Sequence, residues 1–126
     1  MSGFYTKLEK ETVENDNFRK VLFTAEHSQL VLMSLKPGED IGVEVHGNDD
    51  QFIRIDGGVG KAIIGEDEFD LEDGDAIVVP AGEKHNVINS SESEELKLYT
   101  IYSPAHHEDG TVHITKKEAM EAEEDH

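Results

Sequence analysis

Apolar and polar residues alternate over short distances through most of the chain. Stretches of Val, Ile, Leu and Phe, each four to seven residues long, are typical of half-buried β-strands. Clusters of Gly, Asp, Asn and Pro separate these stretches, and such residues favour tight turns. The predicted strands cover residues 19–24, 29–35, 41–46, 51–56, 60–64, 68–71, 76–79, 85–89 and 96–102. Many short strands at this spacing predict an all-β sandwich or barrel.

The two ends of the chain do not follow this pattern. Residues 7–16 are polar and predict either a helix or an extended arm, and residues 116–126 predict a short acidic helix that frays. We find no internal repeat and no linker. The sequence therefore predicts one domain over residues 1–126, with the barrel core at about 20–103.

Composition narrows the range of functions. The chain has 126 residues and no cysteine, so any bound metal must be held by nitrogen and oxygen ligands. Its formal net charge of −18 repels phosphates, and we therefore expect neither nucleic acid nor a membrane as a partner. No signal peptide is recognisable at the N-terminus, and the expected compartment is the cytoplasm.

Candidate chemistry begins with the segment Gly42–His46. Alternate side chains of a strand share a face, so Glu44 and His46 point one way and the valines between and before them point the other. A hairpin after His46 would bring Gln51 back beside it, and His85 follows the tight turn 80–82. A solvated face or an emptied pocket would show the same pattern. An inward carboxylate, however, is costly unless it is paired or bound to a metal.

The spacing of these residues resembles the two motifs of the cupin family. In the first, Gly38 is followed by five residues, Glu44-x-His46, four residues, Gln51, six residues and Gly58. In the second, Gly74 is followed by five residues, Pro80-x-Gly82, two residues, His85, three residues and Asn89. The resemblance covers about residues 30–103. It implies a double-stranded β-helix (jelly-roll) barrel with short N- and C-terminal extensions.

The resemblance also implies one divalent transition metal inside the barrel, held by Glu44, His46, Gln51 and His85. Two of these positions depart from the family pattern. Glu44 stands where the family usually has its first histidine, and Gln51 stands where it usually has glutamate. The set still contains one carboxylate and two histidines, which suits Fe, Mn, Ni, Co or Zn.

A second histidine cluster follows the last predicted strand, with His106, His107 and His113 inside eight residues. It predicts a solvated loop, a second metal site, or a cover over the barrel mouth that supplies a proton-transfer group. On the last interpretation His106, His107 and Tyr102 are the candidate catalytic residues. The same ending is similar to that of small cupins often labelled as resembling mannose-6-phosphate isomerase.

Three functional hypotheses remain open from the sequence. The first is a metal-dependent enzyme on a small polar metabolite, either a sugar or uronate isomerase or ring-opening enzyme, or an Fe(II) dioxygenase. The second is a non-enzymatic module that binds a small molecule. The third is a storage or stress-related barrel without a ligand. A homodimer is expected, because exposed edge strands need cover.

Overall fold

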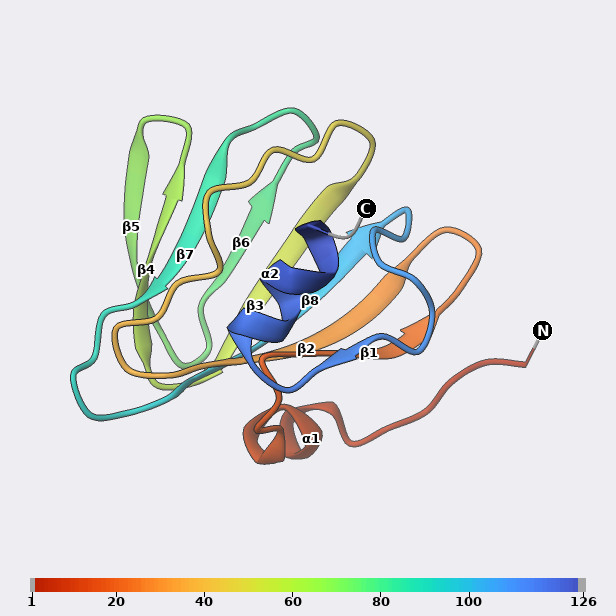
Figure 1. Ribbon diagram of the computed structural model, residues 1–126, viewed down its shortest axis with the longest axis horizontal. Coiled ribbons are helices and arrows are strands. Elements are labelled where there is room, and N and C mark those ends of the chain that lie inside the picture. The colour runs from red at the N-terminus through yellow and green to blue at the C-terminus, as the bar shows by residue number, and fades with distance from the viewer. Residues whose placement is uncertain (1, 125–126) are drawn as a thin grey trace.

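The computed structural model describes residues 2–124, and within them strands make up most of the regular secondary structure (Figure 1). The elements in chain order are α1 (Leu8–Glu14), β1 (Arg19–Thr24), β2 (Gln29–Leu35), β3 (Asp50–Gly57), β4 (Val59–Ile64), β5 (Asp67–Glu72), β6 (Ala76–Val79), β7 (His85–Asn89), β8 (Leu96–Ser103), β9 (Val112–His113) and α2 (Lys116–Glu124). The predicted strands all appear within a few residues of their expected bounds, except the one at 41–46.

The strands form two antiparallel sheets. One has six strands in the order β6-β3-β8-β2-β1-β9, and the other has three in the order β5-β4-β7. Strand β8 lies between β2 and β3, although 60 residues separate it from β2 and 38 from β3 in the sequence, so the sheet is built from long-range pairings. The prediction of an all-β jelly-roll fold is confirmed (Figure 1).

The segment 41–46 is not a continuous strand, and the prediction was wrong there. It makes only two isolated bridges, Asp40 to Ile88 and Glu44 to His85. Between them Gly42 has a φ of 107°, a conformation that residues with a side chain rarely adopt. The Gly42 backbone N–H turns away from the ladder and donates to the side-chain oxygen of Asn86 at 2.9 Å. This glycine therefore interrupts the strand but keeps Glu44 beside His85.

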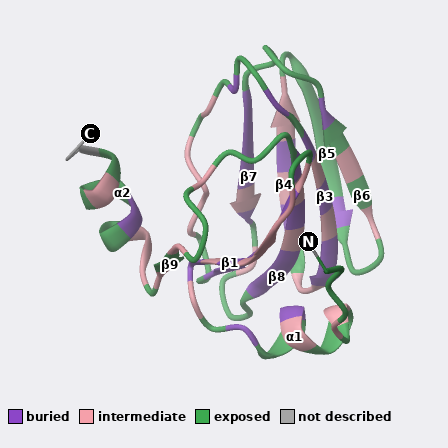
Figure 2. Cartoon of the chain, turned by 90° about the vertical axis from the view of Figure 1, so that its right-hand side faces the viewer, coloured by how far each residue is buried: buried purple, intermediate pink, exposed green. Residues whose placement is uncertain are grey.

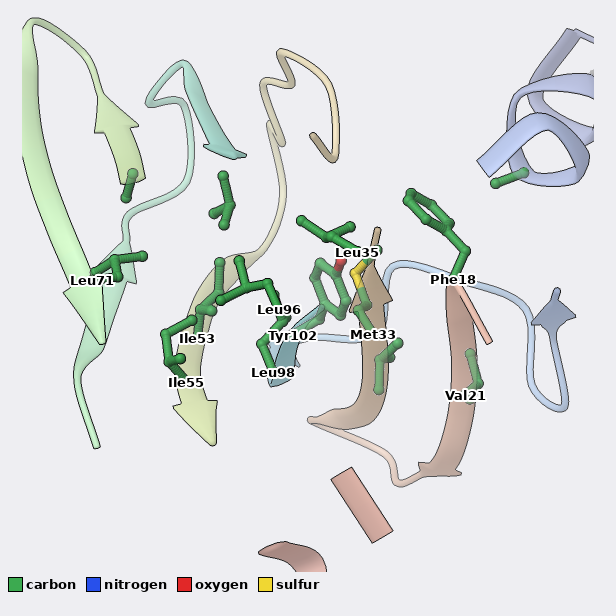
Figure 3. Packing of buried hydrophobic residues seen from close by; sticks show 14 residues of the cluster. Phe18, Val21, Met33, Leu35, Ile53, Ile55, Leu71, Leu96, Leu98 and Tyr102 are labelled. Carbon is green, nitrogen blue, oxygen red and sulfur yellow. The ribbon is translucent and has the colours of Figure 1, made fainter. Parts of the chain in front are cut away.

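The inner faces of β3 and β8 change character along their length. On β3 the inward residues run from Ile55 and Ile53, both 1% exposed, to Gln51. On β8 they run from Leu96 and Leu98, which lie in the apolar core of Figure 3, to Thr100 and then Tyr102. The interior is thus apolar towards one end, where each buried aliphatic side chain contributes about 1.5–3 kcal/mol. Polar groups gather towards the other end.

The two helices lie outside the sheets. Helix α1 confirms the helical alternative for the N-terminal stretch, and it packs below the end of the barrel that carries the apolar core (Figure 2). Helix α2 begins at a capping box, in which the Glu118 N–H donates to Thr115 Oγ1 and the Thr115 N–H donates to Glu118 Oε2. The last two residues of the predicted C-terminal helix lie outside the described range. Neither helix has the length and apolar character needed to cross a bilayer.

Candidate metal centre

Glu44 and His85 face the same side because their backbones pair directly. Each N–H donates to the other residue's carbonyl at 2.9 Å, and side chains of such opposed residues project from the same face. His46 shares that face and is buried, whereas Val43 and Val45 are 62% and 58% exposed on the other. The predicted division of this segment into an inner and an outer face is confirmed.

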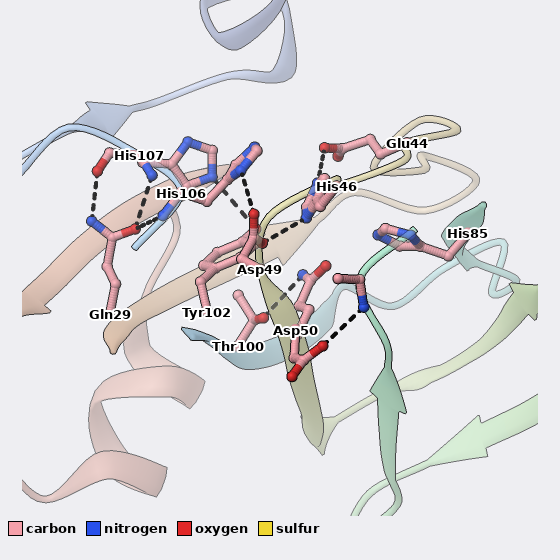
Figure 4. A network of polar contacts seen from close by, with 12 residues as sticks. Gln29, Glu44, His46, Asp49, Asp50, His85, Thr100, Tyr102, His106 and His107 are labelled. Atoms are coloured by element: carbon pink, nitrogen blue, oxygen red, sulfur yellow. Dashed lines mark hydrogen bonds and ion pairs between the residues drawn. The ribbon is translucent and has the colours of Figure 1, made fainter. Parts of the chain in front are cut away.

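Three ligand-type side chains converge at the polar end of the barrel. Glu44, His46 and His106 each offer one donor atom, and these atoms all lie within 4.8 Å of one another. The shortest separation is 2.8 Å, from His46 Nε2 to Glu44 Oε2. His106 comes from the loop after β8, sixty residues away in sequence, and its imidazole stacks on that of His46 with ring centres 4.0 Å apart. Figure 4 shows the three together with their neighbours.

Asp49 orients both imidazoles. Its carboxylate accepts from His46 Nδ1 at 3.0 Å and from His106 Nδ1 at 3.2 Å, one oxygen for each ring. A carboxylate can accept only from a protonated nitrogen, so the two Nδ1 atoms carry hydrogen. The Nε2 atom of each ring then points away from Asp49. Metal-binding histidines in proteins are usually held by a carboxylate in this way. The sequence analysis did not single out Asp49, which looked like part of a polar turn.

Gln29 holds the histidine loop in place. Its side-chain oxygen accepts from the backbone N–H groups of His106 and His107 at 3.2 and 3.0 Å, and its amide nitrogen donates to the His107 carbonyl at 2.8 Å. Gln29 is 1% exposed, so these bonds are shielded from water. It was also missed from the sequence, where a glutamine at the start of an apolar strand was the only signal.

The centre favours a positive charge between Glu44 and His46. Burial alone would lower the pKa of His46, but the carboxylates of Glu44 and Asp49 outweigh it and hold that pKa above 6.5. Burial alone would raise the pKa of Glu44, but the hydrogen bond and charge of His46 hold it below 4.5. The two shifts have one cause, since the negative charges around His46 stabilise a positive charge between these side chains.

Two further predicted ligands, Gln51 and His85, line the same region. The Gln51 amide nitrogen donates to Thr100 Oγ1 at 3.0 Å, while its oxygen is buried with no hydrogen-bond partner among the described residues. His85 donates from Nδ1 to the Glu83 carbonyl at 3.0 Å, which leaves Nε2 as a free acceptor, and its ring centre is 5.0 Å from that of His46. His85 is not among the three residues whose donors lie within 4.8 Å.

The donor atoms fit a divalent transition metal. One carboxylate and two imidazoles converge, both imidazoles are held by a second carboxylate, and a buried amide oxygen lacks a partner. Buried polar atoms rarely remain unsatisfied, and an amide oxygen with no partner among residues 2–124 is a further donor that suits a divalent cation. The set of Glu44, His46, Gln51 and His85 stays a prediction. His106, predicted as a proton-transfer group, joins the candidate ligands.

The other two predicted catalytic residues are buried and stay uncharged. Burial, aided by Arg19, lowers the pKa of His107 to about 2, and burial raises the pKa of Tyr102. The Tyr102 hydroxyl lies 3.4 Å from His107 Nε2, and the Tyr102 ring stacks on His106. Their assignment to proton transfer stays a prediction. Arg54 is half-buried on the outer face of β3, and its Nε lies 3.3 Å from Asp56 Oδ1.

Comparison with known proteins identifies a family. The family model described as "Cupin domain" matches residues 31–102, which include Glu44, His46, Gln51, His85 and Tyr102.

Two relatives match nearly the whole chain. Uncharacterized protein YrkC of Bacillus subtilis is 47% identical, over 96% of this chain and 68% of the relative. An uncharacterized protein of Acanthamoeba polyphaga mimivirus is 44% identical, over 92% and 74%. Among solved structures, BH2720 from Bacillus halodurans superposes with a TM-score of 0.93, is 43% identical, and covers 95% of both chains.

Proposed function

Because this chain belongs to the cupin domain family, we propose that it is a metal-dependent enzyme that acts on a small polar metabolite. One divalent transition metal would be held by Glu44, His46 and His106. The observation that carries the proposal is the convergence of these three donors within 4.8 Å while Asp49 holds both imidazoles from behind.

Gln51 and His85 would complete the set. The unpartnered Gln51 oxygen and the free His85 Nε2 are the nearest additional donors from the barrel wall. With one of them added, the metal would have four protein ligands, and a six-coordinate ion would keep two positions for substrate oxygens; with both added it would keep one. The resemblance of the first and second motifs supports including both residues in the site, and the stacking of His106 on His46 supports adding His106 to them.

The reaction we propose is isomerisation or ring-opening of a sugar or uronate. A bound divalent metal would supply Lewis-acid polarisation of a carbonyl or hydroxyl oxygen. The chain's own contribution is to orient the donors through Asp49, to anchor the covering loop through Gln29, and to keep neutral hydrogen-bonding groups at Tyr102 and His107. Tyr102 keeps its proton, because burial raises the pKa of its hydroxyl.

A second candidate follows from the same donors. Two histidines and one carboxylate with open positions are also the ligand set of non-haem Fe(II) oxygenases. Oxygen uptake by the Fe(II)-loaded protein in the presence of candidate substrates separates the two reactions. Uptake coupled to substrate loss would favour the dioxygenase, and substrate conversion without uptake would favour the isomerase.

The test of the metal centre is elemental analysis of freshly purified protein. We expect close to one transition metal per chain in the wild type and little in His46→Ala and His106→Ala. His27→Ala is the matched control, because the His27 side chain is 88% exposed and lies away from the centre. A wild type without metal, which also fails to gain thermal stability when Mn(II), Fe(II), Co(II), Ni(II) or Zn(II) is added, would contradict the proposal.

We also propose that the protein forms a homodimer. The exposed valines at positions 43, 45 and 78 leave apolar surface that a second copy could cover. Light scattering of the purified protein measures this directly, and a monomer at high micromolar concentration would contradict it.

A further inference from the structure

Arg19 is a buried cation without an acidic partner. Arg19 lies on β1 and is only 3% exposed. Its lack of an acidic partner is unexpected, because the chain has 29 acidic residues. No carboxylate of the described residues lies within 4.0 Å of its guanidinium, and its Nε has no hydrogen-bond partner among them. One terminal nitrogen lies 3.4 Å from His113 Nδ1, which is the only side-chain hydrogen bond of Arg19 within the described residues. A buried unpaired charge is costly, so its retention calls for a reason.

Three other cations on or beside the barrel are paired. Arg54 lies 3.3 Å from Asp56, Lys97 lies 3.2 Å from Asp16, and Lys116 is bonded to Asp40. All three pairs are at least partly exposed to water on one side. Among these four cations Arg19 is the most deeply buried, and no carboxylate of the described residues lies within 4.0 Å of it.

Arg19 also lies between the metal centre and the C-terminal helix. It lines a cavity of about 240 Å³ together with Glu44, and a second of about 290 Å³ together with His106. Helix α2 borders both cavities. The positive charge of Arg19 acts on the centre as well, because it helps to lower the pKa values of Glu44 and His107. A small molecule in either cavity would therefore lie against both this guanidinium and one of the three converging side chains.

We propose that Arg19 binds the carboxylate of the substrate, and that the substrate class is small hydroxylated monocarboxylic acids. This rests on the proposed function, which places a metal at Glu44, His46 and His106. The hydroxyl or carbonyl oxygens at the other end of the acid would reach the metal. Within sugar-derived substrates, the proposal selects the acids over the neutral sugars.

Both the geometry and the charge of the site support a carboxylate. A guanidinium presents paired N–H donors that match the two oxygens of a carboxylate. A divalent cation and Arg19 bring three positive charges, and Glu44 and Asp49 bring two negative ones. With neutral histidines these groups leave one net positive charge, which a monoanion neutralises. The carboxylate of Glu123 also lines both cavities, but it is exposed and screened by water. A phosphate dianion would leave an excess of negative charge in a protein that is already at −18.

The experiment measures binding of three acids beside neutral counterparts of similar size. D-glucuronate, D-threonate and L-lactate are compared with D-glucose, D-threitol and L-lactamide by calorimetry on the Mn(II)-loaded protein. We expect at least one acid to bind the wild type about tenfold or more tightly than its counterpart, because charged hydrogen bonds in a buried site have that effect. In Arg19→Met this preference should disappear, and in Arg19→Lys it should be reduced.

Arg54→Met is the matched control. It removes the only other arginine of the chain, which is half-buried on the outer face of its strand, and it should leave the preference for the acid unchanged. Mn(II) affinity is measured for every variant first, and it should stay within a few-fold of the wild type in Arg19→Met.

The outcomes separate this inference from the proposed function. A wild type that binds no metal would overturn both. A wild type that binds metal but prefers none of the three acids, or an Arg19→Met protein that keeps the preference, would overturn the role of Arg19 alone. If Arg19→Met does not fold, the same binding comparison on the wild type and on Arg19→Lys still tests the role of Arg19. An undiminished preference for the acid in Arg19→Lys would then overturn it.

Discussion

Two buried polar clusters in this protein differ in how fully their atoms are bonded. One surrounds Lys97, whose Nζ donates to the Asn15 carbonyl at 2.6 Å, to Ser34 Oγ at 2.9 Å and to Asp16 Oδ1 at 3.2 Å. The other is the metal centre, where the Gln51 oxygen and the nearby Arg19 Nε have no partner among the described residues. An ammonium group has three N–H donors, and those of Lys97 are all used.

The difference indicates what each cluster is for. Lys97 ties the segment after α1 to strands β2 and β8, and its satisfied bonds need nothing from outside the chain. The candidate metal centre leaves buried polar atoms without a partner among the described residues, which proteins rarely tolerate without a function. Substitutions should therefore affect folding in the first cluster and ligand binding in the second.

The largest expected effect is on stability, in Lys97→Met. Methionine fills a similar volume but leaves the buried Ser34 hydroxyl and the Asn15 carbonyl without their donor, at a cost of about 2–4 kcal/mol in the free energy of unfolding. Urea denaturation measures the loss. Metal affinity should be unchanged, and a large fall in metal affinity would break the division between the two clusters.

Asp49→Asn should give the opposite result. The amide keeps the shape of the side chain but can accept through only one oxygen, so at least one imidazole loses its support and metal affinity should fall about 10–100-fold. Stability of the metal-free protein should change by less than in Lys97→Met. The measurement is a metal titration by calorimetry. Asp50→Asn is the matched control, since Asp50 is exposed and accepts from the Ala81 N–H instead.

Gln29→Leu tests whether the loop is held from a distance. It removes the acceptor for the His106 and His107 backbone N–H groups. We expect a loss of about 1–3 kcal/mol in the free energy of unfolding and a several-fold lower affinity for the metal. Thr24→Val is the control. It removes a different hydrogen-bond partner of Gln29 and leaves the bonds to the loop intact. Equal metal affinity in Gln29→Leu and wild type would show that His106 is not a ligand.

The smallest effect concerns Asp56, a buried carboxylate outside both clusters. Burial raises its pKa above 3.8 despite the nearby Arg54, and its Oδ2 has no partner among the described residues. A group whose pKa is raised by folding favours the native state below its unfolded pKa, and this contribution is lost as the pH rises through the folded value. Asp56→Asn should therefore gain stability relative to the wild type between pH 4 and pH 7, by on the order of 1 kcal/mol or less.

The measurement is the difference in unfolding free energy between wild type and Asp56→Asn at each pH. The difference cancels the many other carboxylates. A constant difference across this range would show that Asp56 has an ordinary environment.

Much of the fold and part of the centre could be predicted from the sequence. Alternation of apolar and polar residues located β1 to β8, because the side-chain period of a strand is a local property, but it did not predict the two-residue strand β9. The same period placed Glu44 and His46 on one face. The prediction was wrong at 41–46, where the conformation of Gly42 and its bond to Asn86 interrupt the strand. Alternation alone does not show such an interruption.

The sequence by itself determined the all-β architecture, the spacing of the two motifs and the residue types that could bind a metal. Only the tertiary structure decided that His106 reaches Glu44 and His46, that Asp49 supports both rings, and that Arg19 is buried without a counterion. These relations depend on contacts between segments far apart in the chain, such as the bond from the His106 N–H to Gln29 across 77 positions. Long-range packing sets such contacts, and local periodicity contains no information about them.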